Sequence, residues 1–183
     1  MNKTTAALVS IASVGGAALI GAQFGPQRPR EAIWYETLRK PSYTPSGSTI
    51  GFAWGILETL LAVTGYRLLT RPNSAARGTA LASWGATLAG LTGYPALFFG
   101  GKKLGPSAAV ATAMCASTTA TAAAASKVDE VAAVSMTPLV LWTMFAVVLS
   151  EEVWRRNQPR RSRGRVPGTT ATQPGALADV VAP

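Results

Sequence analysis

The sequence predicts an all-α integral membrane protein, a bundle of five transmembrane helices. Apolar residues make up 48% of its 183 residues and charged residues only 14%, well below the ~25% that is typical of soluble chains. Five stretches poor in charge, each close to the ~20 residues that a bilayer requires, are separated by short segments rich in Pro, Gly and basic residues. We therefore expect one membrane domain over residues 1–157, followed by a disordered basic tail over residues 158–183.

The first predicted span covers residues 5–24, which combine large apolar residues with Gly, Ala, Ser, Thr and Gln. A cleavable signal peptide is the competing interpretation, because Lys3 provides a short basic start. Small residues between Gly15 and Gly21 suit close contact with a neighbouring helix.

Residues 25–49 are predicted to form a loop that folds back over the bundle as a lid. Four prolines prevent a long helix, although residues 30–39 have room for a short one. A solvated connector gains nothing from large apolar side chains, yet this segment contains Trp34, Tyr35, Leu38 and Tyr43.

The other predicted spans are residues 50–69, 79–99, 105–126 and 131–151. Residues 105–126 are mostly Ala, Thr and Ser, which makes this span the weakest by hydropathy but suits tight helix packing. Trp84 and Trp154 are expected to be core or interface residues rather than ligand contacts.

Five spans place the two termini on opposite sides of the membrane, and the distribution of Lys and Arg residues indicates which side faces the cytoplasm. Five of the 17 Lys and Arg residues fall on the N-terminal side, and the other twelve fall with the lid loop and the C-terminal tail. The positive-inside rule therefore places the C-terminus in the cytoplasm. The tail arginines are expected to be solvated there, with contacts to anionic lipid as the alternative.

The composition also bears on other kinds of site. The sequence has no His and a single Cys, Cys115, so we expect no metal site of ordinary kind and no disulfide. The net charge of +9 does not indicate nucleic acid, because the basic residues lie between apolar stretches and in the tail. Phosphate-binding loops, nucleophile elbows and dinucleotide fingerprints are absent from the sequence. We expect neither a cofactor nor a nucleic-acid partner.

Two segments resemble the TspO/MBR family of membrane proteins. The first, before and within the second span, matches the family at Trp34, Tyr35, Leu38, Lys40, Pro41, Ser42, Pro45, Gly51, Trp54, Ile56 and Leu57. The second, in the last span, matches at Val128, Asp129, Ala132, Pro138, Trp142, Phe145, Ala146, Leu149, Trp154, Arg155 and Asn157. Between them the segment 97–100, Leu-Phe-Phe-Gly, is the firm anchor.

The resemblance implies a cleft that binds tetrapyrroles and other flat hydrophobic ligands. The matching positions are Trp34, Tyr35, Trp54, Trp142 and Ala146, beneath a lid that ends at Pro45. The chain departs from the family's pattern at several positions. A family Tyr is replaced by Glu58, Asn and Trp of the third span by Leu91 and Tyr94, and the late Asn-Tyr by Ser150 and Glu151.

Glu58 is the most conspicuous of these departures. At 1.5 Å per residue it lies ~14 Å into its helix, where an ionised carboxylate costs at least ~2.5 kcal/mol unless it is paired or protonated. Tyr94 falls at a similar depth, so it joins the expected ligand-binding set. That set is Trp34, Tyr35, Pro45, Trp54, Glu58, Tyr94, Trp142 and Ala146.

The sequence leaves an enzymatic alternative open. A protonated acid in a dry aromatic pocket is the arrangement that protonates an alkene or epoxide. Glu58 would then be the general acid of a membrane-embedded cyclase or isomerase acting on a terpenoid-like substrate, with Glu151 as a second acid or base if it turns inward. The alternative for Glu58 is a hydrogen-bonding strut between helices.

Three acidic residues have a structural interpretation, which for Glu151 is the equal alternative to its role as a second acid or base. Glu151 and Glu152 stand four residues before Arg155 and Arg156, the spacing of ordinary helix-surface ion pairs. Asp129 is expected only to begin a helix.

The function that we expect is binding of a flat or polyene hydrophobic molecule, of tetrapyrrole, sterol or isoprenoid type, beneath the lid. Membrane lipid is the other expected partner, and the sequence leaves a homodimer open. A scaffold that acts only through the small-residue faces of the first and fourth spans is a further alternative.

Overall fold

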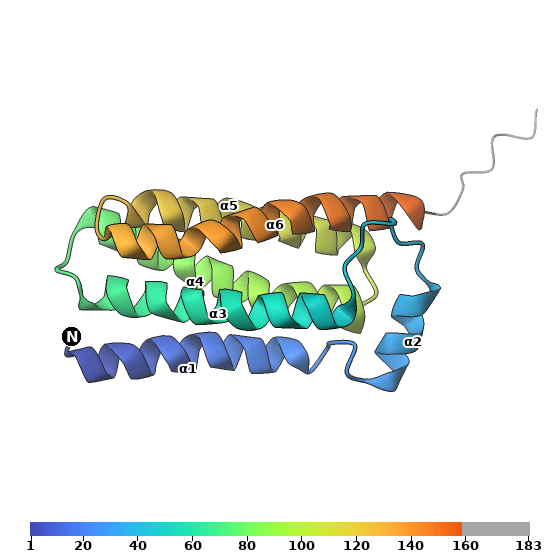
Figure 1. The fold of residues 1–183 in the computed structure, drawn as a ribbon, viewed down its shortest axis with the longest axis horizontal. Helices are drawn as coiled ribbons and strands as arrows, with labels where there is room; N and C mark the ends of the chain where they lie inside the picture. Colours follow the sequence, from blue (N-terminus) through green and yellow to red (C-terminus); the bar gives the residue numbers. More distant parts are fainter. Residues whose placement is uncertain (159–183) are drawn as a thin grey trace, which may run out of the picture.

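The computed structural model describes residues 1–158, and the regular secondary structure of these residues is entirely helical (Figure 1). Their order is α1 (Lys3–Ala22), α2 (Pro29–Thr37), α3 (Gly47–Thr70), α4 (Ala75–Pro95), the short π-helix η1 (Ala96–Gly100), α5 (Leu104–Ala125) and α6 (Glu130–Arg156). The all-α prediction is thus confirmed for these residues. The predicted basic tail lies outside the described residues, except for Gln158.

Four of the described helices are long and apolar enough to cross a membrane, namely α1, α3, α5 and α6. The helix α4 is not among them, so the count of five spans stays a prediction. The predicted span 79–99 took part of its apolarity from Leu97, Phe98 and Phe99, which the structure places in η1, after α4 has ended at Pro95. Within the helix bounds of the structure, which leave η1 out of α4, α5 qualifies and α4 does not.

The long helices form a closed ring in the order α1, α3, α6, α5 and α4, and each packs against the next. Figure 1 shows them lying lengthwise together, with the N-terminus and the α3–α4 and α5–α6 connections at one end. The short helix α2 and the last turns of α6 lie at the other end, which we call the lid end. We call the end that holds the N-terminus and these two connections the Asp129 end.

The centre of the ring combines apolar side chains with hydrogen bonds between helices. Its apolar cluster is Val14, Leu57, Leu61, Trp84, Met136 and Leu139. The Trp84 indole donates a hydrogen bond of 3.0 Å to the Leu61 carbonyl, so Trp84 is a core residue as expected. The Ser10 hydroxyl likewise donates across to the Ala62 carbonyl at 2.6 Å. Helices surrounded by lipid are not driven together by the hydrophobic effect, so such hydrogen bonds contribute to their association in addition to packing.

Two glycines let neighbouring helices approach closely. A Cβ at Gly65 of α3 would overlap the Ser10 hydroxyl and the Trp84 ring, and one at Gly21 of α1 would lie 2.8 Å from the Leu91 carbonyl oxygen. By contrast, Gly15 has open space beside it. Of the three glycines of α1, Gly21 is therefore the one at which a neighbouring helix approaches this closely.

A buried carboxylate fastens the Asp129 end. Asp129 caps α6 by accepting from the Ala132 amide at 2.9 Å, which confirms the expected helix start. Its two oxygens also accept from the Nε atoms of Arg67 and Arg71, both at 2.6 Å. Burial would raise the pKa of Asp129, but these hydrogen bonds outweigh it and lower the pKa to about 2. The ion pairs, which join α3 to α6, were not anticipated from the sequence.

Candidate functional site: a lateral groove between α3 and α6

The lid begins with α2, the short helix that the sequence allowed at residues 30–39. Pro29 occupies its first turn, where a missing N–H costs nothing. Trp34 packs edge-on against Phe98, with 5.5 Å between ring centroids, and Tyr35 lies 5.8 Å from Phe99. Because η1 is a π-helix, its wide turn presents these two adjacent phenylalanines to the lid. We call this group, with Tyr94, the η1 cluster.

The rest of the lid crosses to the end of α6 and is held there by polar contacts. The Asn157 side chain accepts from the Arg39 amide at 3.0 Å and donates to the Arg39 carbonyl at 3.1 Å. The Tyr43 hydroxyl donates to Glu152, which also forms an ion pair with Arg156. That hydrogen bond is the main cause of a raised pKa for the Tyr43 phenol. The polar contacts of the lid therefore converge on the last turns of α6.

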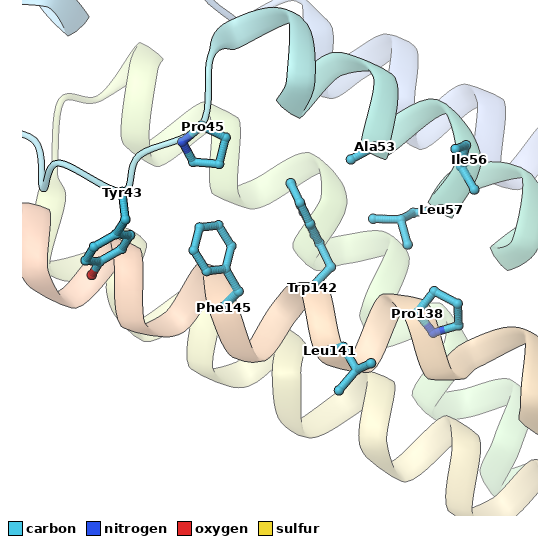
Figure 2. A pocket seen from close by; sticks show the side chains of 9 residues that line it. All are labelled: Tyr43, Pro45, Ala53, Ile56, Leu57, Pro138, Leu141, Trp142 and Phe145. Carbon is cyan, nitrogen blue, oxygen red and sulfur yellow. The ribbon is translucent and has the colours of Figure 1, made fainter.

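Below this contact a groove runs between α3 and α6, with a volume of about 590 Å³, within the range of small-molecule sites. Figure 2 shows Trp142 reaching from α6 toward α3, with Tyr43 and Pro45 of the lid at one end. The residues that line it are Tyr43, Pro45, Ala53, Ile56, Leu57, Pro138, Leu141, Trp142 and Phe145.

The groove opens sideways, toward the lipid that would surround the bundle. Ile56 is 48% exposed and Leu141 62% exposed on its two flanks. None of its lining side chains carries a charge, and only the Tyr43 hydroxyl and the Trp142 indole N–H are polar. The groove is therefore suited to an apolar ligand that enters from the membrane and makes few hydrogen bonds.

The structure separates the predicted ligand-binding residues into groups. Pro45 and Trp142 line the groove, and Trp54 packs edge-on behind Trp142 with ring centroids 6.3 Å apart. Trp34, Tyr35 and Tyr94 instead belong to the η1 cluster, where Tyr94 stacks on Phe98 and hydrogen-bonds Ser150 at 2.9 Å. Within residues 1–158, no aromatic pair links this cluster to the groove.

The remaining predicted residues lie away from the groove lining. Ala146 follows Phe145 on α6 and is half-buried. Glu58 is half-buried, outside the lining, and makes no side-chain hydrogen bond or ion pair with residues 1–158. Glu151 does not turn inward, because its exposed carboxylate pairs with Arg155 at 3.8 Å. That pair and the one between Glu152 and Arg156 confirm the expected surface pairs.

Seven lining residues were missing from the predicted set, although the sequence carried signals for most of them. Ile56, Leu57, Pro138 and Phe145 all belong to the two segments that resemble the family, and Tyr43 is one of the aromatic residues of the lid. Nothing in the local sequence distinguished Ala53 or Leu141 from other apolar helix positions. Only the packing of α3 beside α6 places them at the groove.

Comparisons with known proteins find similar sequences over most of the chain. The model of the TspO/MBR family matches residues 6–155. The chain is 31% identical to a tryptophan-rich sensory protein of Cereibacter sphaeroides over 153 residues, which covers 84% of this chain and 92% of the relative. It is 31% identical to Protein CrtK of Rhodobacter capsulatus over 139 residues (75% and 83% of the two chains). It is 32% identical to the translocator protein of Sus scrofa over 136 residues (73% and 80%).

Proposed function

The chain belongs to the TspO/MBR family of integral membrane proteins, and from this premise we propose that it binds a hydrophobic small molecule in the α3–α6 groove. The observation that carries this proposal is a groove of ligand size, lined by uncharged side chains and capped by Tyr43 and Pro45 of the lid. Trp142 offers a flat apolar surface there, and aromatic faces contribute large contact areas to flat or unsaturated ligands. Tetrapyrroles, sterols and isoprenoids are the ligand classes that we propose.

The domain that holds this site is proposed to be a five-span bundle over residues 1–157, with α4 as the fifth span. The 21 residues of α4 extend ~31 Å at 1.5 Å per residue, which matches the ~30 Å hydrocarbon core of a bilayer. It lies in the ring between α1 and α5, two helices that qualify as spans. A helix enclosed by spans on both sides is expected to cross with them.

We also propose that the lid end faces the cytoplasm. Among residues 1–158 the lid end carries eight Lys and Arg residues and the Asp129 end five, so the positive-inside rule favours this orientation. Tags at the two termini test it in sealed vesicles. Protease should reach only one tag from a given side, and access to both tags from the same side would contradict the orientation and the count of spans together.

The enzymatic alternative finds no support in the structure or in the comparisons. Its general acid, Glu58, lies outside the groove lining, and its second acid, Glu151, is exposed and paired. The groove itself offers no carboxylate at its walls. Binding therefore remains the proposed function.

Fluorescence titration of the full-length protein in nanodiscs tests the proposal. Protoporphyrin, cholesterol and farnesol are the probes, and quenching of the intrinsic Trp fluorescence is the readout. At least one probe should quench saturably, and Ala53→Phe, which fills the groove, should weaken its binding roughly tenfold because it removes the space for the ligand. Val63→Phe is the matched control, because Val63 is exposed on the same helix but does not line the groove.

Two results would overturn the proposal. One is the absence of saturable quenching with every probe in folded protein, and the other is equal binding by Ala53→Phe and Val63→Phe. The scaffold alternative, in which the protein acts through partner helices or as a homodimer, would then take its place.

A further inference from the structure

The groove does not end at Pro138. A second groove, of about 420 Å³, continues along the same seam and is lined by Leu60, Glu130, Val131, Val134, Ser135 and Pro138. Pro138 lines both, so the two meet at its ring. The distance along α6 from Glu130 to Phe145 is ~22 Å at 1.5 Å per residue. The joined grooves are therefore long, and they extend along most of the thickness of a bilayer's hydrocarbon core.

The hydrogen-bonding groups gather at the two ends of this seam. At the lid end, the Tyr43 hydroxyl and the Glu152 carboxylate stand beside Arg156. At the other end lie Ser135 and the exposed residue Glu130. Between these two ends the lining of the first groove is almost entirely hydrocarbon, as at Leu57 and Leu141. There, among residues 1–158, the Trp142 indole N–H is the one polar side-chain group.

The charges at the lid end favour a neutral polar group over an anionic one. Arg156 is already paired with Glu152, so no uncommitted cation stands beside Tyr43 within residues 1–158 to accept a ligand carboxylate. A carboxylate placed there would also face Glu152 at close range, which is repulsive. A hydroxyl, in contrast, can donate to Glu152 or accept from Tyr43.

We propose that the two grooves together hold one linear isoprenoid alcohol, with its hydroxyl at Tyr43 and Glu152 and its chain running past Pro138 to Val134. This inference rests on the proposed binding function and narrows its ligand class. A linear chain matches the length of the joined grooves, and its double bonds pack on the rings of Tyr43, Trp142 and Phe145.

Chain length provides the first test. Geraniol, farnesol and geranylgeraniol are titrated into the full-length protein in nanodiscs with Trp fluorescence as the readout. Each added isoprene unit should lower Kd roughly threefold, a modest factor because the chain leaves lipid rather than water and gains only packing contacts. Oleyl alcohol, an unbranched chain, should bind more weakly than geranylgeraniol.

Blocking the second groove provides the matched comparison. Val134→Trp should weaken geranylgeraniol binding roughly tenfold and leave geraniol binding unchanged, because only the long chain reaches Val134. Binding to the Trp variants is measured with radiolabelled alcohols, since an added indole would change the Trp fluorescence. Val148→Trp is the control, because Val148 is equally apolar and exposed on α6 but lines neither groove. If the Trp variants do not fold, Val134→Phe and Val148→Phe replace them.

The hydroxyl end is tested with Tyr43→Phe, which keeps the ring and removes one hydrogen-bonding group. Farnesol should bind roughly fivefold more weakly to this variant, the size of a single hydrogen bond. Farnesene, which lacks the hydroxyl, should bind equally to both proteins.

The outcomes separate this inference from the function on which it rests. Saturable binding that is indifferent to chain length, or equal effects of Val134→Trp and Val148→Trp on geranylgeraniol, would overturn the linear-chain inference and leave the binding function standing. Non-saturable quenching by every alcohol, as expected of annular lipid, would overturn the inference. If protoporphyrin and cholesterol also failed to bind, the proposed function would fall with it.

Discussion

The two ends of the bundle are fastened in different ways. At the Asp129 end a fully buried carboxylate holds Arg67 of α3, Arg71 directly after α3, and the first turn of α6. At the lid end the equivalent connection depends on exposed or half-exposed groups, among them Asn157 with Arg39 and Tyr43 with Glu152. Buried charge pairs are costly to break, whereas exposed ones contribute little. We therefore expect the Asp129 end to act as a fixed anchor and the lid end to be the part that opens.

The backbone shows the same difference. At the lid end α4 gives way to the π-helix η1, and Lys102 adopts a positive φ of 53°. Such irregular segments are common at functional sites. The Asp129 end joins α5 to α6 in a short turn packed on Leu68 and Ala80. The α3–α6 groove is capped at the irregular end, and four predictions test the contrast.

The largest effect is expected for Asp129→Asn. This change keeps the shape of the side chain but removes the charge that both arginines share, so it should lower the free energy of unfolding by about 2 kcal/mol, less than a fully buried pair because the arginines reach solvent. The apparent Tm in detergent should fall by about 5 °C. Glu130→Gln, at the exposed neighbouring residue, is the control. Equal Tm values for the two variants would contradict the claim that the ion pairs of Asp129 stabilise this end of the bundle.

The same carboxylate predicts how stability depends on pH. The pKa of Asp129 is lowered from an ordinary value of 3.8 to about 2, so its contribution is complete above pH 3.8 and is lost as the pH falls through about 2. Thermal unfolding of the wild type and Asp129→Asn, measured from about pH 5 to about pH 2, should show a difference in Tm that shrinks as the pH falls. A difference that stays constant would be inconsistent with ion pairing at Asp129.

An intermediate effect is expected for Tyr94→Phe, in the η1 cluster. It removes the hydrogen bond to the buried Ser150 hydroxyl, which should cost about 1 kcal/mol. In the Tyr94→Phe variant, Ser150→Ala should lower the free energy of unfolding by less than it does in the wild type, because the two hydroxyls share one hydrogen bond. Strict additivity of the two changes, measured by denaturation in detergent, would show that the bond contributes nothing.

The smallest effect on stability is expected for Asn157→Ala, at the lid end. The two bonds to Arg39 that it removes are exposed, and the third, to the Val153 carbonyl, lies within the last turn of α6. The free energy of unfolding should therefore change by only about 0.5 kcal/mol. Binding and release of farnesol, followed by stopped-flow Trp fluorescence, should both become faster because the lid opens more often. If the rates of farnesol binding and release stay unchanged while stability falls as much as in Asp129→Asn, the lid end would be the fixed anchor and not the part that opens.

The sequence was sufficient to predict most of the fold because helix positions follow from local patterns. Apolar stretches and prolines placed the long helices within a few residues of their observed ends, and the resemblance at residues 34–57 indicated the family. The predicted span at residues 79–99 lies within a continuous helical stretch made of α4 and η1, but hydropathy does not register that its hydrogen bonding changes from α to π after Pro95.

The site was less predictable because it depends on which faces of two distant helices meet. Trp142 and Pro45 were expected and line the groove, whereas Glu58, the most unusual residue by sequence, lies outside the lining. The depth of a residue along a helix is readable from its number, but its direction around the helix axis depends on packing. Asp129 was underestimated for the same reason, since its arginine partners lie about 60 positions away in the chain.

Photolabelling tests the central claim most directly, that ligands bind in the groove capped by the lid. A farnesol analogue with a diazirine beside its hydroxyl is bound to the protein in nanodiscs and activated, and the labelled peptides are identified by mass spectrometry. The account predicts adducts near Tyr43, Pro45 and Phe145 that excess farnesol prevents. Adducts confined to Trp34 and Phe98 of the η1 cluster, or spread over the outer faces of α4 and α5 and insensitive to competition, would contradict it.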